Sequence, residues 1–193
     1  SPVNAEHLMM KLVTVAEMRA IEREADASGL SYAQMMENAG LGLAEVVEDE
    51  FGYLADQGIL GLVGSGNNGG DALVALAHLA QQGWRTAAYL LRDRQPADPL
   101  LLRFSGAGGK IWKLAEDENF SSLDRLLAEH AVLLDGVLGT GISLPLQAPL
   151  AGALDHIRSY RQENDQPQVV VAVDCPSGVD CDSGEAAPET IPA

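Results

Sequence analysis

The chain has 193 residues, 47% of them hydrophobic, which is enough for one sizeable core and excludes a chain that is disordered by composition. Its formal net charge of −16 argues against nucleic acid and anionic membranes as partners, because their phosphates would be repelled. No apolar run is long enough to span a membrane, and no N-terminal signal pattern is present. We therefore expect a cytoplasmic protein in which the two cysteines, Cys175 and Cys181, are reduced.

The first part of the chain predicts two helices before any strand. Thr14 and Glu17 have the spacing of a capping box, and the helical pattern that follows them stops at Gly29. Ser31 and Gln34 repeat the same spacing ahead of a second helical pattern. The chain is therefore expected to place two consecutive helices ahead of its first strand.

From residue 59 onward, apolar strand patterns alternate with helical patterns. The predicted strands are continuous apolar runs at 59–63, 86–91, 110–114, 131–138 and 168–174. The predicted helices lie between them, at 71–83, 98–105, 121–130 and 149–163. This alternation is typical of an α/β fold with a parallel sheet covered on both faces, and right-handed crossovers make it a doubly wound, Rossmann-like sheet.

The domain organisation is expected to be simple. Residues 1–11 are expected to be a flexible leader, and residues 12–193 to form a single domain. The last segment, 185–193, is a turn-rich tail at a position where a sheet of this kind would often gain another strand. We therefore expect the domain to be truncated at its C-terminus.

Three of the predicted strands end in glycine-rich sequences that each carry an aspartate. These sequences are "GSGNNGGD", "DGVLGTG" and "VDCPSGVD", at the ends of the strands 59–63, 131–138 and 168–174. In an open α/β sheet the ligand binds outside the carboxyl ends of the strands, near the point where the winding reverses. The usual winding makes these three ends neighbours, so we expect the ligand site there.

The first of these ends contains the pattern G-x-G-x-x-G. Gly64, Gly66 and Gly69 lie between a strand and a helix, the context of a dinucleotide fingerprint, in which backbone approaches a pyrophosphate. Asn67 and Asn68 fit that turn poorly, because their amides bring two carbonyl oxygens and two NH₂ donors. One asparagine could act as a turn former, and a second indicates a side-chain ligand for a polar group or a cation.

The other two ends supply carboxylates. Asp135 lies inside an apolar strand, so its side chain must be paired, bound to a metal, or hydrogen-bonded to nearby backbone N–H groups. Asp174 closes the strand 168–174 and is expected at the top of the sheet, with an Asx-turn into "PSG" as the alternative. Together with the Ser177 hydroxyl and an asparagine carbonyl, these groups suit a hard cation.

Three motifs resemble those of the NAD(P)HX epimerase family, the YjeF N-terminal domain. They are "GSGNNGGDALVALAHL", "LLDGVLGTGISLPL" and "VAVDCPSGVDCDSGE". The opening "TVAEMRAIEREADASGLSYAQMMENAG" resembles the two leading helices of that family, so the resemblance covers residues 12–187. Members interconvert the R and S forms of hydrated NADH or NADPH, a damage product of the reduced cofactor. The resemblance therefore implies an isomerase, NAD(P)H-hydrate epimerase, acting in nicotinamide cofactor repair.

The same resemblance implies partners and roles for individual residues. It implies a homodimer with one potassium ion per subunit, NADHX or NADPHX as the substrate, and an ADP- or ATP-dependent dehydratase domain fused in the full-length chain. Positions matching the potassium ligands are Asn68, Asp135 and Ser177. Positions matching the substrate site are Asn67, Asn68, Gly69, Gly70, Asp71, Gly139, Thr140, Gly141, Ile142, Ser143, Leu144, Pro145 and Asp174. We hypothesise that Asp174 is the catalytic acid–base group.

Two interpretations from other functional classes stay open. An NAD-dependent oxidoreductase would share the glycine pattern, although the chain offers no separate substrate domain and no evident base for hydride transfer. A non-catalytic nucleotide-binding or protein-interaction module would keep the fold without the activity.

The chain also departs from the family pattern at Ala72, where glycine is frequent, and at Cys175, where an aliphatic residue is usual. No basic cluster marks a site for a 2′-phosphate, so NADHX and NADPHX are not distinguished.

Overall fold

The computed structural model describes residues 27, 29, 31–139, 144–165, 168–173, 177 and 186–192. The predicted leader and the predicted helix before Gly29 lie outside these residues. The described strands form one parallel five-stranded sheet in the order β3-β2-β1-β4-β5. The Rossmann-like sheet predicted from the sequence is thus confirmed, with the winding reversed between β1 and β4.

The elements follow the predicted order; β1 has the predicted bounds, and the other elements differ from the predictions at one or both ends. The strands are β1 (Ile59–Val63), β2 (Thr86–Leu90), β3 (Lys110–Lys113), β4 (Val132–Gly136) and β5 (Val169–Ala172). The helices are α2 (Tyr32–Phe51), α3 (Asn67–Gln81), α4 (Pro99–Gly106), α5 (Ser121–Glu129) and α6 (Leu150–Glu163). The largest difference is in α3, which begins at Asn67, whereas the sequence predicts a start at residue 71. None of the described helices combines the length and the hydropathy that crossing a membrane requires.

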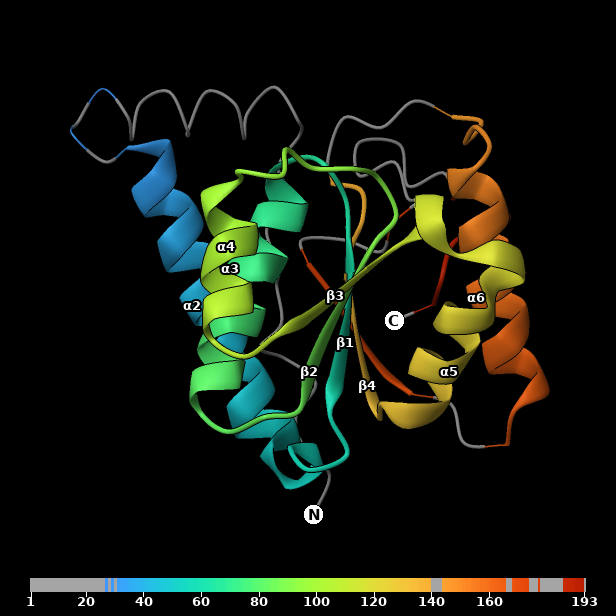
Figure 1. Cartoon of the computed structure of the whole chain (residues 1–193), viewed down its shortest axis with the longest axis horizontal. Helices are drawn as coiled ribbons and strands as arrows, with labels where there is room; N and C mark the ends of the chain where they lie inside the picture. The colour runs from blue at the N-terminus through green and yellow to red at the C-terminus, as the bar shows by residue number, and fades with distance from the viewer. Residues whose placement is uncertain are drawn as a thin grey trace, which may run out of the picture.

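Helices cover both faces of the sheet, as Figure 1 shows, with α2, α3 and α4 on one side and α5 and α6 on the other. Each side has its own apolar cluster: Leu73, Leu76 and Phe104 belong to the first, and Leu123 and Leu154 to the second. The central strands β1 and β4 are buried along their whole length, as their continuous apolar runs predict. The core therefore holds the strand ends in place from both faces.

Helix α2 begins as its sequence predicts. The Ser31 hydroxyl accepts a hydrogen bond from the backbone N–H of Gln34 at 3.2 Å, which is one half of a capping box. The Gln34 side chain does not return to the cap but donates to Asn38. Farther along, Glu37 of α2 receives two hydrogen bonds from the Arg103 guanidinium of α4, at 2.5 and 3.0 Å. This pair therefore connects α2 with α4.

The Glu37–Arg103 pair makes part of the stability depend on pH. The hydrogen bond from Arg103 lowers the pKa of Glu37, so the ionised form is favoured in the folded state. The pair's contribution is therefore present above the unfolded pKa, roughly 4.3, and is lost as pH falls through the folded pKa. We expect Glu37→Gln to lower the free energy of unfolding by about 0.5–1 kcal/mol at pH 7, the scale of a partly exposed pair. Urea denaturation should show that the difference in free energy of unfolding between wild type and Glu37→Gln becomes smaller from pH 7 to pH 3.5. The control Glu45→Gln, on the same helix, should unfold like the wild type.

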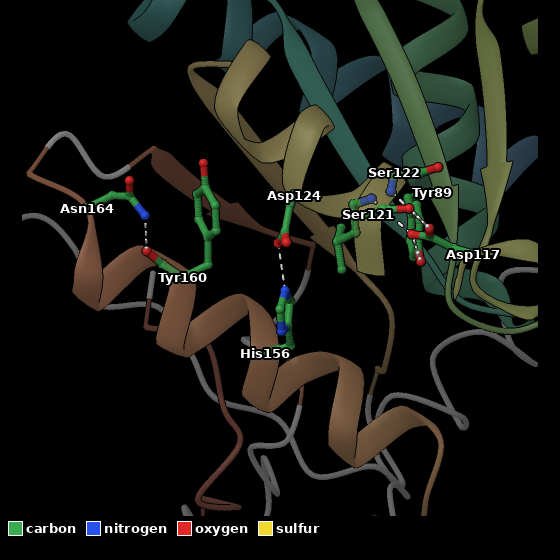
Figure 2. A network of polar contacts seen from close by, with 9 residues as sticks. Tyr89, Asp117, Ser121, Ser122, Asp124, His156, Tyr160 and Asn164 are labelled. Carbon is green, nitrogen blue, oxygen red and sulfur yellow. Dashed lines mark hydrogen bonds and ion pairs between the residues drawn. The ribbon is translucent and has the colours of Figure 1, made fainter. Parts of the chain in front are cut away.

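A buried polar contact fixes the start of α5 against the sheet (Figure 2). Tyr89 of β2 is fully buried and donates from its hydroxyl to Asp117, at 2.9 Å. The same carboxylate accepts the backbone N–H groups of Ser122 and Leu123, both at 2.9 Å, and so satisfies two of the first donors of α5. Burial, followed by the bond to Asp117, raises the pKa of Tyr89 above its ordinary range, so the hydroxyl stays protonated and donates.

Removal of the Asp117 carboxylate should therefore be costly. Asp117→Ala leaves two helix donors and one buried hydroxyl without their acceptor, and we expect the free energy of unfolding to fall by about 2–4 kcal/mol. Tyr89→Phe removes only the hydroxyl and should cost about 1 kcal/mol. Urea denaturation of both variants and of the double variant measures the coupling. Strictly additive losses would show that the two groups do not act together.

Candidate functional site

The three glycine-rich strand ends meet at one edge of the sheet, as the topology predicts. The N–H of Gly64, just past β1, donates to the oxygen of Gly136 in β4 at 3.0 Å. The N–H of Val173, just past β5, donates to the oxygen of Asp135 at 2.9 Å. The ends of β1, β4 and β5 are thus bonded to one another, with β4 in the middle.

Close packing requires two of the three glycines of the first motif, Gly64 and Gly69, whereas a Cβ on Gly66 would meet no atom within 4 Å. A Cβ atom on Gly64 would lie 1.9 Å from the oxygen of Val137, and one on Gly69 would lie 2.1 Å from the oxygen of Gly64. Gly64, Gly66 and Gly69 all have φ outside the left-handed region, so unusual backbone torsions are not the reason for glycine here. The motif brings the end of β1 against the end of β4 and the start of α3 against β1.

The two asparagines lie in the first turn of α3 and not in the preceding loop. Asn67 is exposed and Asn68 is half-buried, whereas Gly69 and Gly70 are buried. Four poor helix formers in a row hide this start from sequence analysis, because asparagine and glycine both have low helical propensity. The first N–H groups of a helix lack partners within it, so this turn is suited to receive an anion.

Asn68 ties the ends of β4 and β5 together. Its Nδ2 donates to the oxygen of Leu138 at 3.1 Å and to the oxygen of Val173 at 3.0 Å. Two carbonyl oxygens from different strand ends therefore converge on one amide group. Gly139 leaves room for that amide, because a Cβ there would lie 2.9 Å from both Cγ and Oδ1 of Asn68. Asn68 thus makes polar contacts with two strand ends, and its role as a ligand stays a prediction.

Asp135 and Ser177 form the second half of this polar centre. Asp135 is completely buried, and its Oδ2 accepts the backbone N–H of Ser177 at 2.7 Å. Its Oδ1 accepts the Ser177 hydroxyl at 2.5 Å, and that hydroxyl oxygen in turn accepts the N–H of Leu138 at 2.8 Å. Burial raises the pKa of Asp135, while the hydrogen bonds from Ser177 act in the opposite direction. The hydrogen-bonded alternative expected for Asp135 is therefore present.

The donor set fits a potassium ion in its chemistry. It consists of one carboxylate, one hydroxyl, one amide and two backbone carbonyl groups, and oxygen ligands of this kind suit a hard cation. A positive charge beside Asp135 would also offset the cost of keeping an ionised carboxylate buried. Within the described part of the chain, no group of three His, Cys, Asp or Glu side chains could hold a metal ion, so a cation here would have the Asp135 carboxylate as its one charged ligand and neutral oxygens for the others.

Some of the predicted site residues lie outside the described structure. They are Thr140, Gly141, Ile142, Ser143 and Asp174. Of the same loop, Gly139 and Leu144 are half-buried and Pro145 is exposed, and Asp71 is half-buried on α3. A hollow of about 940 Å³ lies at the amino ends of the strands, away from the carboxyl ends that form the candidate site. It is lined by Arg85, His130 and Gln168 among others, and it includes none of the predicted site residues.

One charged residue of this site, Arg94, could not be predicted from the sequence pattern. Its Nη1 donates to the backbone oxygens of both Gly64 and Gly66 at 3.0 Å. Partners of this kind leave no trace in a sequence pattern, since every residue has a backbone oxygen. The only local signal is Asp98, four residues on, which pairs with the guanidinium at 2.9 Å.

Comparison with known proteins places the chain in a family. Residues 32–193 match the family profile described as YjeF-related protein N-terminus. An NAD(P)H-hydrate epimerase of Nitrosopumilus maritimus is 32% identical over 182 residues, which cover 91% of this chain and 78% of the relative. An NAD(P)H-hydrate epimerase of Bordetella pertussis is 33% identical over 177 residues, which cover 91% of this chain and 70% of the relative.

Longer relatives and a solved structure agree with this placement. A bifunctional NAD(P)H-hydrate repair enzyme Nnr of Moorella thermoacetica is 34% identical over 181 residues, and the match covers 91% of this chain. The chain spans about a third of that relative, 33% of its length. The crystal structure of yeast ynu0 superposes with a TM-score of 0.80 at 21% identity, covering 94% of this chain and 77% of the yeast chain. At this identity the likeness concerns the fold.

Proposed function

Because the chain belongs to the family described as YjeF-related protein N-terminus, we propose that it is an NAD(P)H-hydrate epimerase. The membership expected from the three motifs is confirmed, and two relatives of which the chain covers two thirds or more carry this name. The reaction interconverts the R and S forms of NADHX or NADPHX. The observation that supports it best is the convergence of Asn68, Asp135 and Ser177 at the joined ends of β1, β4 and β5.

The substrate is held, in this proposal, by the turn 64–71 and the loop 139–145. The first turn of α3 presents backbone N–H groups, which favour a phosphate by hydrogen bonding and by the helix dipole. The net charge of −16 would oppose a polyanionic ligand at long range. Local N–H donors must therefore dominate the binding, and a ligand with few phosphates suits such a site better than a nucleic acid does.

The chemistry requires the hydroxyl-bearing carbon next to the ring nitrogen to invert. In our proposal the carboxylic acid of Asp174 donates a proton to the hydroxyl, the carbon–oxygen bond breaks, and the nitrogen lone pair stabilises the resulting cation. Water then adds to the opposite face and gives up a proton, which restores the acid. Atoms and charge balance over the cycle, since one water leaves and one returns. The nucleotide needs no redox partner.

Asn68, Asp135 and Ser177 would hold a potassium ion, together with the carbonyl oxygens of Leu138 and Val173. The ion would supply a fixed positive charge that keeps Asp135 ionised. Ser177 also donates to Asp135, and Asn68 donates to the backbone oxygens of Leu138 and Val173, which keeps the ends of β4 and β5 together. These residues would thus orient the site, whereas Asp174 is the group proposed for proton transfer.

Two assemblies complete the proposal. One is a homodimer with one potassium ion per subunit. The other is a fused ADP- or ATP-dependent dehydratase, which agrees with the word "bifunctional" in the name of the Moorella relative. An epimerase beside a dehydratase that accepts one form would allow both forms to be repaired.

A coupled assay tests the proposed function directly. A mixture of R and S NADHX is supplied with an S-specific dehydratase and potassium, and the recovery of NADH is followed. Recovery of the R portion well above its spontaneous rate would support the epimerase. A folded chain that binds the nucleotide without accelerating recovery would favour the binding-module interpretation, and hydride transfer with NAD would favour the oxidoreductase.

A further inference from the structure

Arg94 joins two turns at the carboxyl edge of the sheet. It lies just past β2, and its side chain is only 8% exposed although it carries a full charge. Nη1 donates to the backbone oxygens of Gly64 and Gly66, and Nε donates to Oδ2 of Asp98 at 2.9 Å. The turn that leads into α3 is thus bound by a side chain that comes from the neighbouring strand.

These bonds determine the direction of the peptide groups ahead of α3. In a planar trans peptide, the C=O group and the N–H group of the next residue point in opposite directions. The oxygen of Gly66 accepts from Arg94 and also from the backbone N–H of Gly70 in α3, so the N–H of Asn67 points to the other side. The oxygen of Gly64 fixes the N–H of Ser65 in the same way. Arg94 therefore orients the Gly64–Ser65 peptide group and, together with the first backbone bond of α3, the Gly66–Asn67 peptide group.

Asp98 and the start of α3 hold the Arg94 side chain in place. The second oxygen of Asp98, Oδ1, accepts the N–H of Leu100 at 2.9 Å and caps α4. On the other side, a Cβ atom on Gly69 would lie 3.0 Å from Arg94 Nη1, so the start of α3 packs directly on the guanidinium. A buried cation with an anchored carboxylate and two anchored carbonyl partners has one orientation open to it.

We propose that Arg94 is a positioning residue for the turn 64–71, which it holds in the conformation that receives the nucleotide. It acts through the backbone of Gly64 and Gly66 and not through contact with the substrate. The nature of the ligand rests on the function proposed above, whereas the anchoring of the turn does not. Lysine is a poor replacement, because a single ammonium lacks the planar fork that reaches two carbonyl groups and a carboxylate together.

The test compares Arg94→Met and Arg94→Lys with a matched control, Arg103→Met. Arg103 of α4 also forms an ion pair, but its side-chain partner is Glu37 of α2 and not a residue of the turn. We expect Arg94→Met to raise KM for NADHX by about tenfold or more, with kcat changed by less than about threefold. Arg94→Lys should fall between it and the wild type. Arg103→Met should lower the melting temperature and leave KM unchanged.

Hydrogen exchange followed by mass spectrometry supplies a readout that does not depend on activity. In Arg94→Met, amides within 64–71 should exchange at least about tenfold faster, while those of β1 and β4 keep their protection. Arg103→Met should leave the turn protected. If the wild-type chain shows no epimerase activity, the proposed function fails, and this comparison still decides whether Arg94 orders the turn.

Three results would overturn the proposal. One is Arg94→Met with the KM and the exchange rates of the wild type. Another is an equal rise of KM in Arg94→Met and Arg103→Met, which would reduce Arg94 to a general contributor to stability. The third is failure of both Arg94 variants to fold, which would make the residue a determinant of the fold and not of the turn.

Discussion

An Asp174→Asn variant is expected to epimerise NADHX roughly 10²- to 10⁴-fold more slowly than the wild-type chain, which is the usual effect of losing a general acid–base group. Breaking the carbon–oxygen bond releases hydroxide unless a proton is delivered, and an amide cannot deliver and recover one. Asp174 directly follows Val173, the residue whose N–H is bonded to the oxygen of Asp135.

The coupled epimerase assay measures this loss as kcat and KM over a range of pH. The wild type should show a pH-dependent limb that disappears in Asp174→Asn, since the titrating group is gone. Asp182→Asn is the matched control, because it removes the same charge from the same segment of the chain. Turnover by Asp174→Asn within a few-fold of the wild type would contradict the assignment.

An Asp135→Asn variant is expected to lose its response to potassium and to retain its fold. Asparagine keeps the size of the side chain and still accepts the N–H of Ser177, whereas it removes the one anionic ligand of the proposed ion site. Without potassium the variant should be at least as stable as the wild type, because no charge has to be buried at that position. Epimerase activity in potassium should fall by roughly 10- to 100-fold.

The response to potassium is measured as the shift in melting temperature between KCl and NaCl at equal ionic strength. Ligand binding to the folded state raises the melting temperature, so the wild type should shift and Asp135→Asn should not. Asp155→Asn, which changes an exposed carboxylate of α6, should shift like the wild type. An equal shift in wild type and Asp135→Asn would contradict the ion site. Asp135 would then serve only to accept the hydrogen bonds from Ser177.

Much of the fold could be predicted because its signals are local. The run at 59–63 is apolar, is followed by Gly64 and is buried throughout, so the prediction and β1 agree at both ends. The start of α3 was hidden, because Asn67, Asn68 and two glycines disfavour a helix that tertiary packing then imposes. The meeting of the three strand ends followed from a general rule of winding, and the structure confirms it.

The side-chain partnerships of the site could be predicted only in part. The burial of a polar group in an apolar strand marks Asp135 as a residue with a partner, but the partner, Ser177, lies 42 positions away. The winding rule brought the two strand ends together and the resemblance to a family named both residues as ligands, but neither gave the hydrogen bonds between them. Arg94 had no such support, and its partners are backbone atoms 28 and 30 positions earlier. Contacts of this kind depend on the folded sheet and leave no periodic signal.

The pairing of β4 has a consequence for how this domain can change by mutation. Asp135 stands opposite Leu62 on one side and Ala172 on the other, and it is the last residue of β4 that pairs with β5. Side chains alternate between the two faces along a strand, so inserting one residue into β4 before this position would exchange the faces of everything beyond it. Substitutions that keep the length of the strand can be absorbed by either core, whereas a single insertion would separate Asp135 from Ser177 and Asn68. Surviving variants of this domain should therefore vary in the composition of β4 far more freely than in its length.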